Sequence, residues 1–139
     1  MSSKLLICPY FGRFPEWFDQ WVANMQHLKP MGYDYLIETN LKLFKQRVRD
    51  TLGIEPNIEP ETGKPWDYRP MLGVMYAKEL EGYDYWGHTD FDVVYGDVSK
   101  YEPEGYDIWS NHHNYICGFW TLYKNTEKVN NLFRLCDTW

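Results

Sequence analysis

Two aspartates two positions apart, Asp90 and Asp92, end an aromatic, strand-like run that begins at Tyr83. Side chains at alternate positions of an extended backbone point to the same side, so both carboxylates are expected to face one point in space. Like charges held that close raise the pKa of one group unless a cation compensates for them. Oxygen ligands at a short spacing suit Mg²⁺ or Mn²⁺. The pair therefore predicts a divalent metal site that takes an anionic ligand.

The elements that must position this pair alternate between strands and helices. Strands are expected at 4–8, at 33–39, over the run that leads to the aspartates, at 106–110 and at 116–123. Helices are expected from Pro15 onward, at 41–52, at 69–80 and at 125–136, with a proline-containing loop at 55–65. This alternation predicts a single α/β domain over 1–139, a three-layer sandwich with a mainly parallel sheet. Ligands of such sheets gather at the carboxyl ends of the strands, where the two aspartates lie.

Two helices carry more detailed expectations. In the helix at 69–80 the apolar side is expected to consist of Met71, Leu72, Met75, Tyr76 and Leu80. Asn125 is the expected N-cap of the last helix, because asparagine is preferred at that position.

Composition excludes some classes of function. The chain has 139 residues, of which 44% are hydrophobic, and a net charge of −6. Nucleic-acid binding needs clustered Lys and Arg to neutralise phosphates, and no basic stripe is present, so that partner is excluded. Aromatic residues make up 19% of the chain. Such residues can stack on sugars or bases, although most large aromatic side chains fill cores.

The spacing of the cysteines and the length of the apolar runs indicate the cellular compartment. Cys8, Cys117 and Cys136 are widely spaced, without a Cys-x-x-Cys pair, so they are expected to be buried, reduced thiols and not a disulfide framework or zinc site. The longest apolar run near the start, 5–8, is too short for a signal peptide or a membrane span. A cytoplasmic protein without a transmembrane segment is expected.

Four segments in a fixed order carry a resemblance to a known family. They are Pro9-Tyr10-Phe11-Gly12, the aromatic-Arg-Pro segment at 68–70, the Asp90-Phe91-Asp92 motif with Gly96-Asp97 just beyond, and the segment 118–125. With these motifs the chain resembles bacterial and viral glycosyltransferases of the GT-A type over nearly its whole length. The resemblance implies a Rossmann-like GT-A domain that binds a nucleotide-sugar donor, most often a UDP-sugar, with Mn²⁺ or Mg²⁺ as cofactor.

The resemblance also implies roles for individual residues. Asp92 would bind the metal that bridges to the diphosphate, and Asp90 would contact the ribose or reach the metal through water. Tyr10 and Phe11, after the first strand, would border or stack on the base. Packing in the core is an equally good interpretation of this aromatic pair.

Three further residues have a proposed role and a plain alternative. Thr39 and Asn40, after the second strand, would hydrogen-bond the base or ribose, although Asn40 is equally suited to cap the helix at 41–52. Arg69, near a helix start, would meet the diphosphate, and the alternative for it is an ordinary surface charge.

The other polar residues near these motifs favour structural roles. Asp97 is better suited to a turn than to a metal site. His88 could join the metal shell, but its position next to the pair supports this only weakly. His112 and His113 lie in a polar stretch that is typical of a solvated loop.

The sequence also departs from the family pattern. GT-A enzymes commonly place a late metal ligand, acceptor-binding residues and, where inverting, a general base beyond the segment that corresponds to 118–125. This sequence ends at Trp139, so we expect the donor half with a missing or reduced acceptor half. Where the family's second strand tends to end in Thr-Asp, this chain has Thr39-Asn40. No catalytic residue is assigned, and the acceptor, a saccharide or another molecule, stays open.

Two other functions stay open as alternatives. A shortened GT-A-like domain could bind a nucleotide, a sugar or a protein without catalysis, and a second copy of the chain could cover apolar surface that shortening exposes. A haloacid-dehalogenase-type phosphatase would use Asp90 as nucleophile and Asp92 as acid/base. Acidic partners for that chemistry are sparse after Asp92, namely Glu127 and Asp137.

Overall fold

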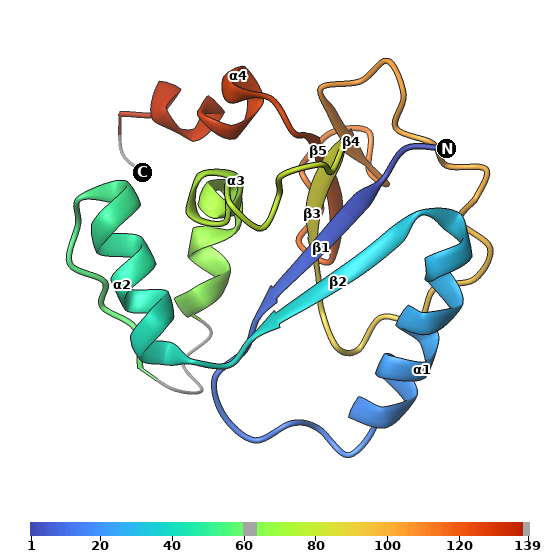
Figure 1. The fold of residues 1–139 in the computed structure, drawn as a ribbon, viewed down its shortest axis with the longest axis horizontal. Coiled ribbons are helices and arrows are strands. Elements are labelled where there is room, and N and C mark those ends of the chain that lie inside the picture. The colour runs from blue at the N-terminus through green and yellow to red at the C-terminus, as the bar shows by residue number, and fades with distance from the viewer. Residues whose placement is uncertain (60–63, 138–139) are drawn as a thin grey trace.

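The computed structural model describes residues 1–59 and 64–137, and one open five-stranded sheet lies at its centre (Figure 1). In chain order the strands are β1 (Lys4–Pro9), β2 (Tyr33–Glu38), β3 (Tyr85–Thr89), β4 (Ile108–Ser110) and β5 (Trp120–Lys124). In space their order is β2-β1-β3-β5-β4. β1 pairs in parallel with β2 and β3, whereas β5 pairs antiparallel with β3 and β4. The sheet is therefore parallel at its core, and the α/β prediction is confirmed.

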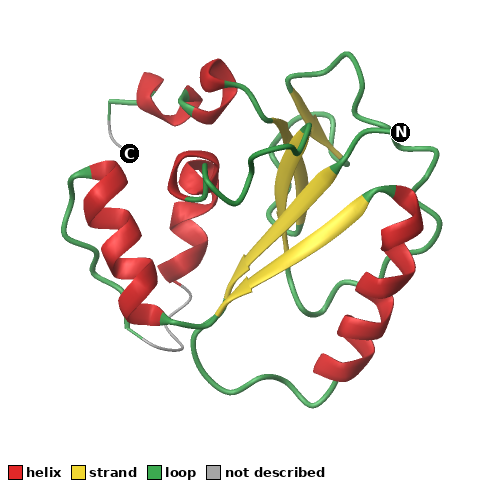
Figure 2. Ribbon diagram, in the orientation of Figure 1, coloured by secondary structure: helices red, strands yellow, loops and turns green. Residues whose placement is uncertain are grey.

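Helices cover both faces of the sheet (Figure 2). The α-helices are α1 (Phe18–Leu28), α2 (Leu41–Leu52), α3 (Leu72–Met75) and α4 (Glu127–Asn130). The 3₁₀ helices of the described residues are η1 (Lys29–Met31), η2 (Lys64–Met71) and η3 (Leu132–Leu135), and they join or extend the α-helices. None of the helices in the described ranges is long and apolar enough to cross a membrane.

Two apolar clusters hold the layers together. On one face Leu5 and Ile7 of β1 and Trp86 of β3 pack with residues of α2 and α3, such as Phe44 and Met75. On the other face a second cluster joins the sheet to α1; its buried members from these elements include Leu6, Cys8, Tyr33, Trp21, Met25, Leu28 and Leu122. Alternate residues of β1 thus enter opposite clusters, as the two-residue period of a strand requires.

The helix α2 is the element whose bounds agree with the prediction at both ends. The Asn40 side chain accepts a hydrogen bond from the Leu43 backbone N–H (3.0 Å), which makes Asn40 its N-cap. Gly53 ends the helix with a left-handed backbone at φ 70°. Phe44, Val48 and Leu52 form its buried face.

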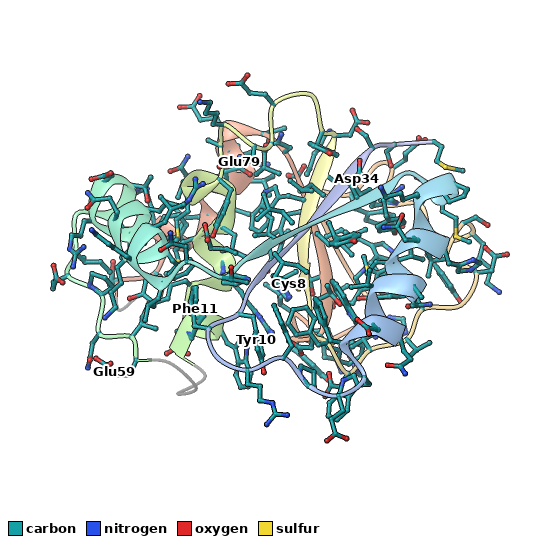
Figure 3. All side chains as sticks on the ribbon, turned by 60° about the horizontal axis from the view of Figure 1, so that its bottom comes forward. Cys8, Tyr10, Phe11, Asp34, Glu59 and Glu79 are labelled. Carbon is teal, nitrogen blue, oxygen red and sulfur yellow. The ribbon has the colours of Figure 1, made fainter. Side chains whose placement is uncertain are left out.

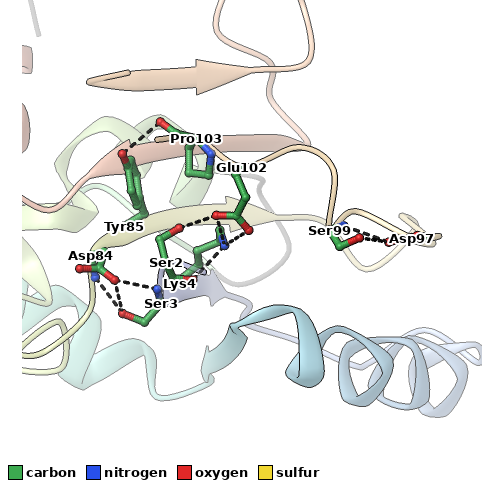
Figure 4. A network of polar contacts seen from close by, with 9 residues as sticks. All are labelled: Ser2, Ser3, Lys4, Asp84, Tyr85, Asp97, Ser99, Glu102 and Pro103. Atoms are coloured by element: carbon green, nitrogen blue, oxygen red, sulfur yellow. Dashed lines mark hydrogen bonds and ion pairs between the residues drawn. The ribbon is translucent and has the colours of Figure 1, made fainter. Parts of the chain in front are cut away.

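A polar network fixes the amino ends of β1 and β3 (Figure 4). The Lys4 side chain is fully buried, and its ammonium donates to both Glu102 oxygens (2.9 and 3.1 Å) and to the Ser2 carbonyl (2.9 Å). Beside it, the Ser3 backbone N–H and hydroxyl donate to one Asp84 oxygen (2.8 and 2.9 Å). These bonds satisfy an otherwise costly buried charge and connect β1 to the segments on either side of β3.

The predicted helix at 69–80 is wrong in form, although its buried side is right. Residues up to Met71 form the 3₁₀ helix η2 with Pro70 inside it, and only one α-helical turn, α3, follows before a series of turns. Gly73 lies inside this segment, and glycine disfavours a helix interior. The apolar residues expected to face the core are nevertheless buried: Met71, Leu72, Met75, Tyr76 and Leu80.

The last helix and the last strand also differ from expectation. Residues 125–136 form two short pieces, α4 and η3, and Thr126 caps α4 in place of Asn125. The Asn125 amide instead donates to the Leu80 and Tyr83 carbonyls, both at 2.9 Å, which ties it to the chain before β3. The strand expected at 116–123 begins only at Trp120.

A long-range packing constraint appears at Gly87, in the middle of β3. A Cβ atom there would collide with the Thr121 carbonyl of β5 and lie 3.2 Å from Leu6 of β1. We therefore expect Gly87→Ala to destabilise the protein by about 1–3 kcal/mol, the usual cost of overpacking a core. Urea unfolding measures this. Gly96→Ala is the matched control, because a Cβ at Gly96 meets no atom within 4 Å. Equal unfolding free energies for the two variants would contradict the packing of β3 between β1 and β5.

Candidate functional site

A cavity of about 310 Å³ opens at the carboxyl ends of β1 and β3. The chain leaves β1 toward β2 on one side and returns as β3 on the other, so these two ends form a topological switch point of the sheet. Three segments line the cavity: 7–10 at the end of β1, 89–92 after β3, and part of η2 with Pro65, Trp66 and Arg69. Pro15 and Trp17 complete it.

Arg69 and Asp90 form an ion pair in this cavity. One guanidinium nitrogen, Nη2, donates to Asp90 Oδ1, and the other, Nη1, donates to the Gly118 carbonyl. The guanidinium also lies over the Trp66 ring, with its carbon 5.6 Å from the ring centroid. The Arg69 side chain is only 15% exposed and that of Asp90 30%. Arg69 is therefore not an ordinary surface charge.

Two effects act in opposite directions on the Asp90 carboxyl. Burial raises its pKa above the ordinary value, and the negative charge of Asp92 adds to that rise. The charge and hydrogen bond of Arg69 act the other way. The pKa of Asp90 is raised because burial outweighs the Arg69 contact. A further cation near Asp90 would therefore stabilise its carboxylate.

Two tryptophans of the α1 region hold the backbone of the acidic segment. The Trp21 indole N–H donates to the Asp90 carbonyl (3.0 Å), and the Trp17 indole N–H donates to the Phe91 carbonyl (2.8 Å). The Phe91 ring is buried and packs edge to face on Trp21, with centroids 4.6 Å apart. The segment 90–92 is thus fixed through its backbone, which leaves both carboxylates to interact in the cavity.

Asp90 and Asp92 would need oxygen atoms of a bound ligand to complete the coordination of a metal ion. Asp92 is exposed and lines the same cavity as Asp90. Within 1–59 and 64–137 there is no group of three or more His, Cys, Asp or Glu side chains that could hold an ion. Mg²⁺ is often bound by one or two carboxylates together with phosphate oxygens and water. Asp90 and Asp92, two carboxylates that line one cavity, are a donor set of this kind.

Of the other candidate residues, some line the cavity and others do not. Tyr10 lines the cavity, with its ring 4.8 Å from that of Phe91. Phe11, labelled beside Tyr10 in Figure 3, is buried and packs edge to face on Phe44 of α2 at 5.2 Å, so it is a core residue. Thr39 and Asn40 are exposed, do not line the cavity, and Asn40 caps α2.

The histidines and Asp97 have structural environments. Burial lowers the pKa of His88 to about 3, and the nearby Arg69 charge adds to the effect. His88 Nδ1 has no hydrogen-bond partner among the described residues. The His112 ring stacks on Tyr115, and His113 is exposed. Asp97 accepts bonds from the Ser99 N–H (3.0 Å) and hydroxyl (2.6 Å), which confirms its interpretation as a turn residue.

Sequence reasoning missed several residues of the cavity wall. Trp17 and Trp66 are large, exposed aromatic side chains that line it, and Cys8 borders it with its thiol donating to the Thr89 carbonyl (2.9 Å). Burial raises the pKa of that thiol to about 12, so it is unreactive. Cys117 is buried as expected, whereas Cys136 is exposed. The available signal was the position of Trp66 two residues before the segment 68–70.

Comparison with known families places the chain in a group without an assigned activity. A family of unknown function (DUF6625) matches residues 35–138. The chain belongs to this family. The matched region contains Arg69, Asp90 and Asp92, whereas Tyr10 and Trp17 precede it. No curated protein and no solved structure matches the chain.

The buried His88 makes stability depend on pH in a defined window. In the unfolded chain a histidine takes up a proton near pH 6.5, whereas folded His88 does so only near pH 3. The unfolded state therefore binds more protons between these values, and stability falls as pH falls through the window. Between pH 7.5 and 5.5 the wild type should lose about 1.4 kcal/mol more than His88→Leu in urea unfolding.

The control for this measurement is His27→Gln, which removes an exposed histidine of α1. It should keep the wild-type dependence on pH. If the free energies of unfolding of the wild type and His88→Leu change equally with pH, His88 is accessible to protons in the folded state.

Proposed function

We propose that the chain binds a nucleotide-sugar, with a UDP-sugar as the expected donor, in the cavity between β1 and β3, and transfers its sugar to an acceptor. The observation that carries this proposal is the convergence of Asp90, Asp92 and Arg69 on one cavity at the switch point of the sheet. The parallel β2-β1-β3 core with helices on both faces supports a Rossmann-like domain of the GT-A type.

The charged residues have distinct roles in this proposal. Asp92, exposed and without the Arg69 contact, would hold the divalent cation. Asp90 Oδ1 stays with Arg69, and its other oxygen orients the ribose or a water of the cation shell. A bound Mn²⁺ or Mg²⁺ would act as a Lewis acid that stabilises the charge on the departing diphosphate. Arg69 would stabilise the same charge as a fixed, poorly solvated hydrogen-bond donor.

Aromatic side chains would bind the nucleoside. Tyr10, just after the end of β1, and Trp66, in η2, both line the cavity. A base that enters the cavity can stack on either ring. The cavity volume, about 310 Å³, lies at the lower end of the range for small-molecule sites.

A second candidate function is nucleotide binding without transfer. Arg69 already occupies one oxygen of Asp90, and the described residues contain no larger group of metal-binding side chains. Both observations suit a domain that recognises a nucleotide and does no chemistry on it. Release of UDP from a panel of UDP-sugars would favour the transferase. UDP binding without turnover would favour the binding module, and phosphate release from p-nitrophenyl phosphate would favour a phosphatase.

Metal and nucleotide should stabilise the folded chain together. Only the folded state can bind them, so UDP with Mn²⁺ at about 100 times its dissociation constant should add about 2.7 kcal/mol and raise the Tm. Asp92→Asn should abolish the Mn²⁺-dependent part of the shift. Asp97→Asn, which removes a carboxylate outside the cavity, is the matched control and should keep it. No metal-dependent shift of the wild type with any nucleoside diphosphate would end the donor-site proposal.

Arg69 can be tested separately from the metal. Arg69→Met removes the cation but keeps an unbranched apolar stem, so UDP affinity should fall about 10- to 100-fold, as expected for a lost hydrogen bond to a charged group. Isothermal titration calorimetry with Mn²⁺ present measures this loss. Arg49→Met removes an exposed arginine from α2 and should bind UDP like the wild type. Unchanged affinity in Arg69→Met would show that the diphosphate does not meet Arg69.

A further inference from the structure

A second hollow of about 270 Å³ adjoins the first cavity. The two share Trp17, Phe91 and Asp92. Gln20 and Trp21 of α1 and the valines Val93 and Val94 complete the second hollow and take no part in the first. A ligand in either space therefore touches the same short wall, and a ligand in the second hollow lies within reach of one in the first.

The wall of the second hollow is rigid and aromatic. Trp17 is 52% exposed, but its indole N–H is tied to the Phe91 carbonyl at 2.8 Å, which limits rotation of the ring. Behind it Trp21 is buried and held by its own bond to the Asp90 carbonyl (3.0 Å). An exposed ring that is already fixed loses little conformational entropy when a ligand packs on it.

The chemistry of the hollow selects a flat, neutral ligand with a polar rim. Trp17, Val93 and Val94 offer apolar surface, whereas polar groups come from the Gln20 amide and the Asp92 carboxylate. Among the described residues, the lining of this hollow contains no Lys or Arg side chain that would attract a phosphate or another anion. A pyranose ring has one face of C–H groups and a rim of hydroxyls, which match an aromatic ring and hydrogen-bonding side chains respectively.

We propose that this second hollow is the acceptor subsite, where one sugar ring of a neutral saccharide packs on Trp17 and hydrogen-bonds Gln20 and Asp92. The choice of a saccharide as occupant rests on the proposed function. In the transfer, an acceptor hydroxyl oxygen forms a bond to the anomeric carbon of the donor sugar. The bond from that carbon to the diphosphate oxygen breaks, its electron pair leaves with the nucleoside diphosphate, and the hydroxyl proton passes to water.

Saturation-transfer NMR tests this subsite with a stated panel: the methyl α- and β-pyranosides of glucose, galactose and mannose, together with lactose. At least one of them should receive saturation from the wild-type protein. Trp17→Ala should weaken that binding roughly tenfold or more, because the stacking surface is lost. Trp17→Phe keeps an aromatic face and should retain most of the binding. Gln20→Ala, at an exposed position, should weaken it several-fold without affecting the fold.

Tyr106→Ala is the control, because Tyr106 is an exposed aromatic side chain that lines neither hollow. It should bind the saccharide like the wild type. If no member of the panel binds, or if binding survives Trp17→Ala undiminished, the acceptor subsite is overturned. Far-UV circular dichroism and the Tm of Trp17→Ala check that the variant is folded, and Gln20→Ala gives an independent readout if it is not.

The acceptor subsite and the donor site are refuted by different experimental results. A Mn²⁺-dependent shift with UDP but no saccharide binding would refute the acceptor subsite alone. Saccharide binding that depends on Trp17, without any shift from nucleoside diphosphates, would refute the donor site and leave the second hollow as a sugar-binding site.

Discussion

The arrangement of the molecule depends on β1, which is paired in parallel on both of its edges. Lys4 to Pro9 align with Tyr33 to Glu38 on one side, and Lys4 to Ile7 align with Tyr85 to His88 on the other. Such a strand can bury both faces, and its residues pack alternately into the two apolar clusters. Because the chain departs from β1 in one direction and returns on the other side, no crossover covers the gap between the ends of β1 and β3. The cavity is a consequence of this connectivity.

Electrostatics then determines what that gap can hold. An ion pair with little exposure contributes little net stability, because removal of the two charges from water offsets their attraction. The Arg69–Asp90 contact is therefore weak evidence for a support of the fold, and under the proposed function it would arrange charges for a ligand. Arg69 also reaches the Gly118 carbonyl, so the same side chain connects η2 to the loop before β5. An anion that draws Arg69 toward itself would act on that loop as well as on Asp90.

Local patterns predicted the elements well where one residue decides the outcome. Asn40 and Gly53 bound α2, and the apolar runs of β1 and β2 lie within one residue of their predicted ends. The helix at 69–80 failed because Gly73, which disfavours a helix interior, lies where the chain packs closely on Trp86, a contact that no spacing rule contains. In the site, Tyr10, Asp90 and Asp92 could be predicted to meet because each follows the end of a strand. The bonds from Trp17 and Trp21 to backbone carbonyls could not, since they join residues about 70 positions apart.

The hydrogen bonds from Trp17 and Trp21 bear on how ligands in the two hollows would affect each other. They fix the backbone of 90–92, whereas Asp92 itself stays exposed at the wall that both hollows share. If each hollow binds a ligand, Asp92 belongs to both sites, and linkage requires that each ligand change the affinity for the other by the same factor. A cation at Asp92 would remove the negative charge that a second ligand meets there. Occupation of the first cavity would therefore alter the second without movement of the backbone, because the coupling depends on one shared carboxylate.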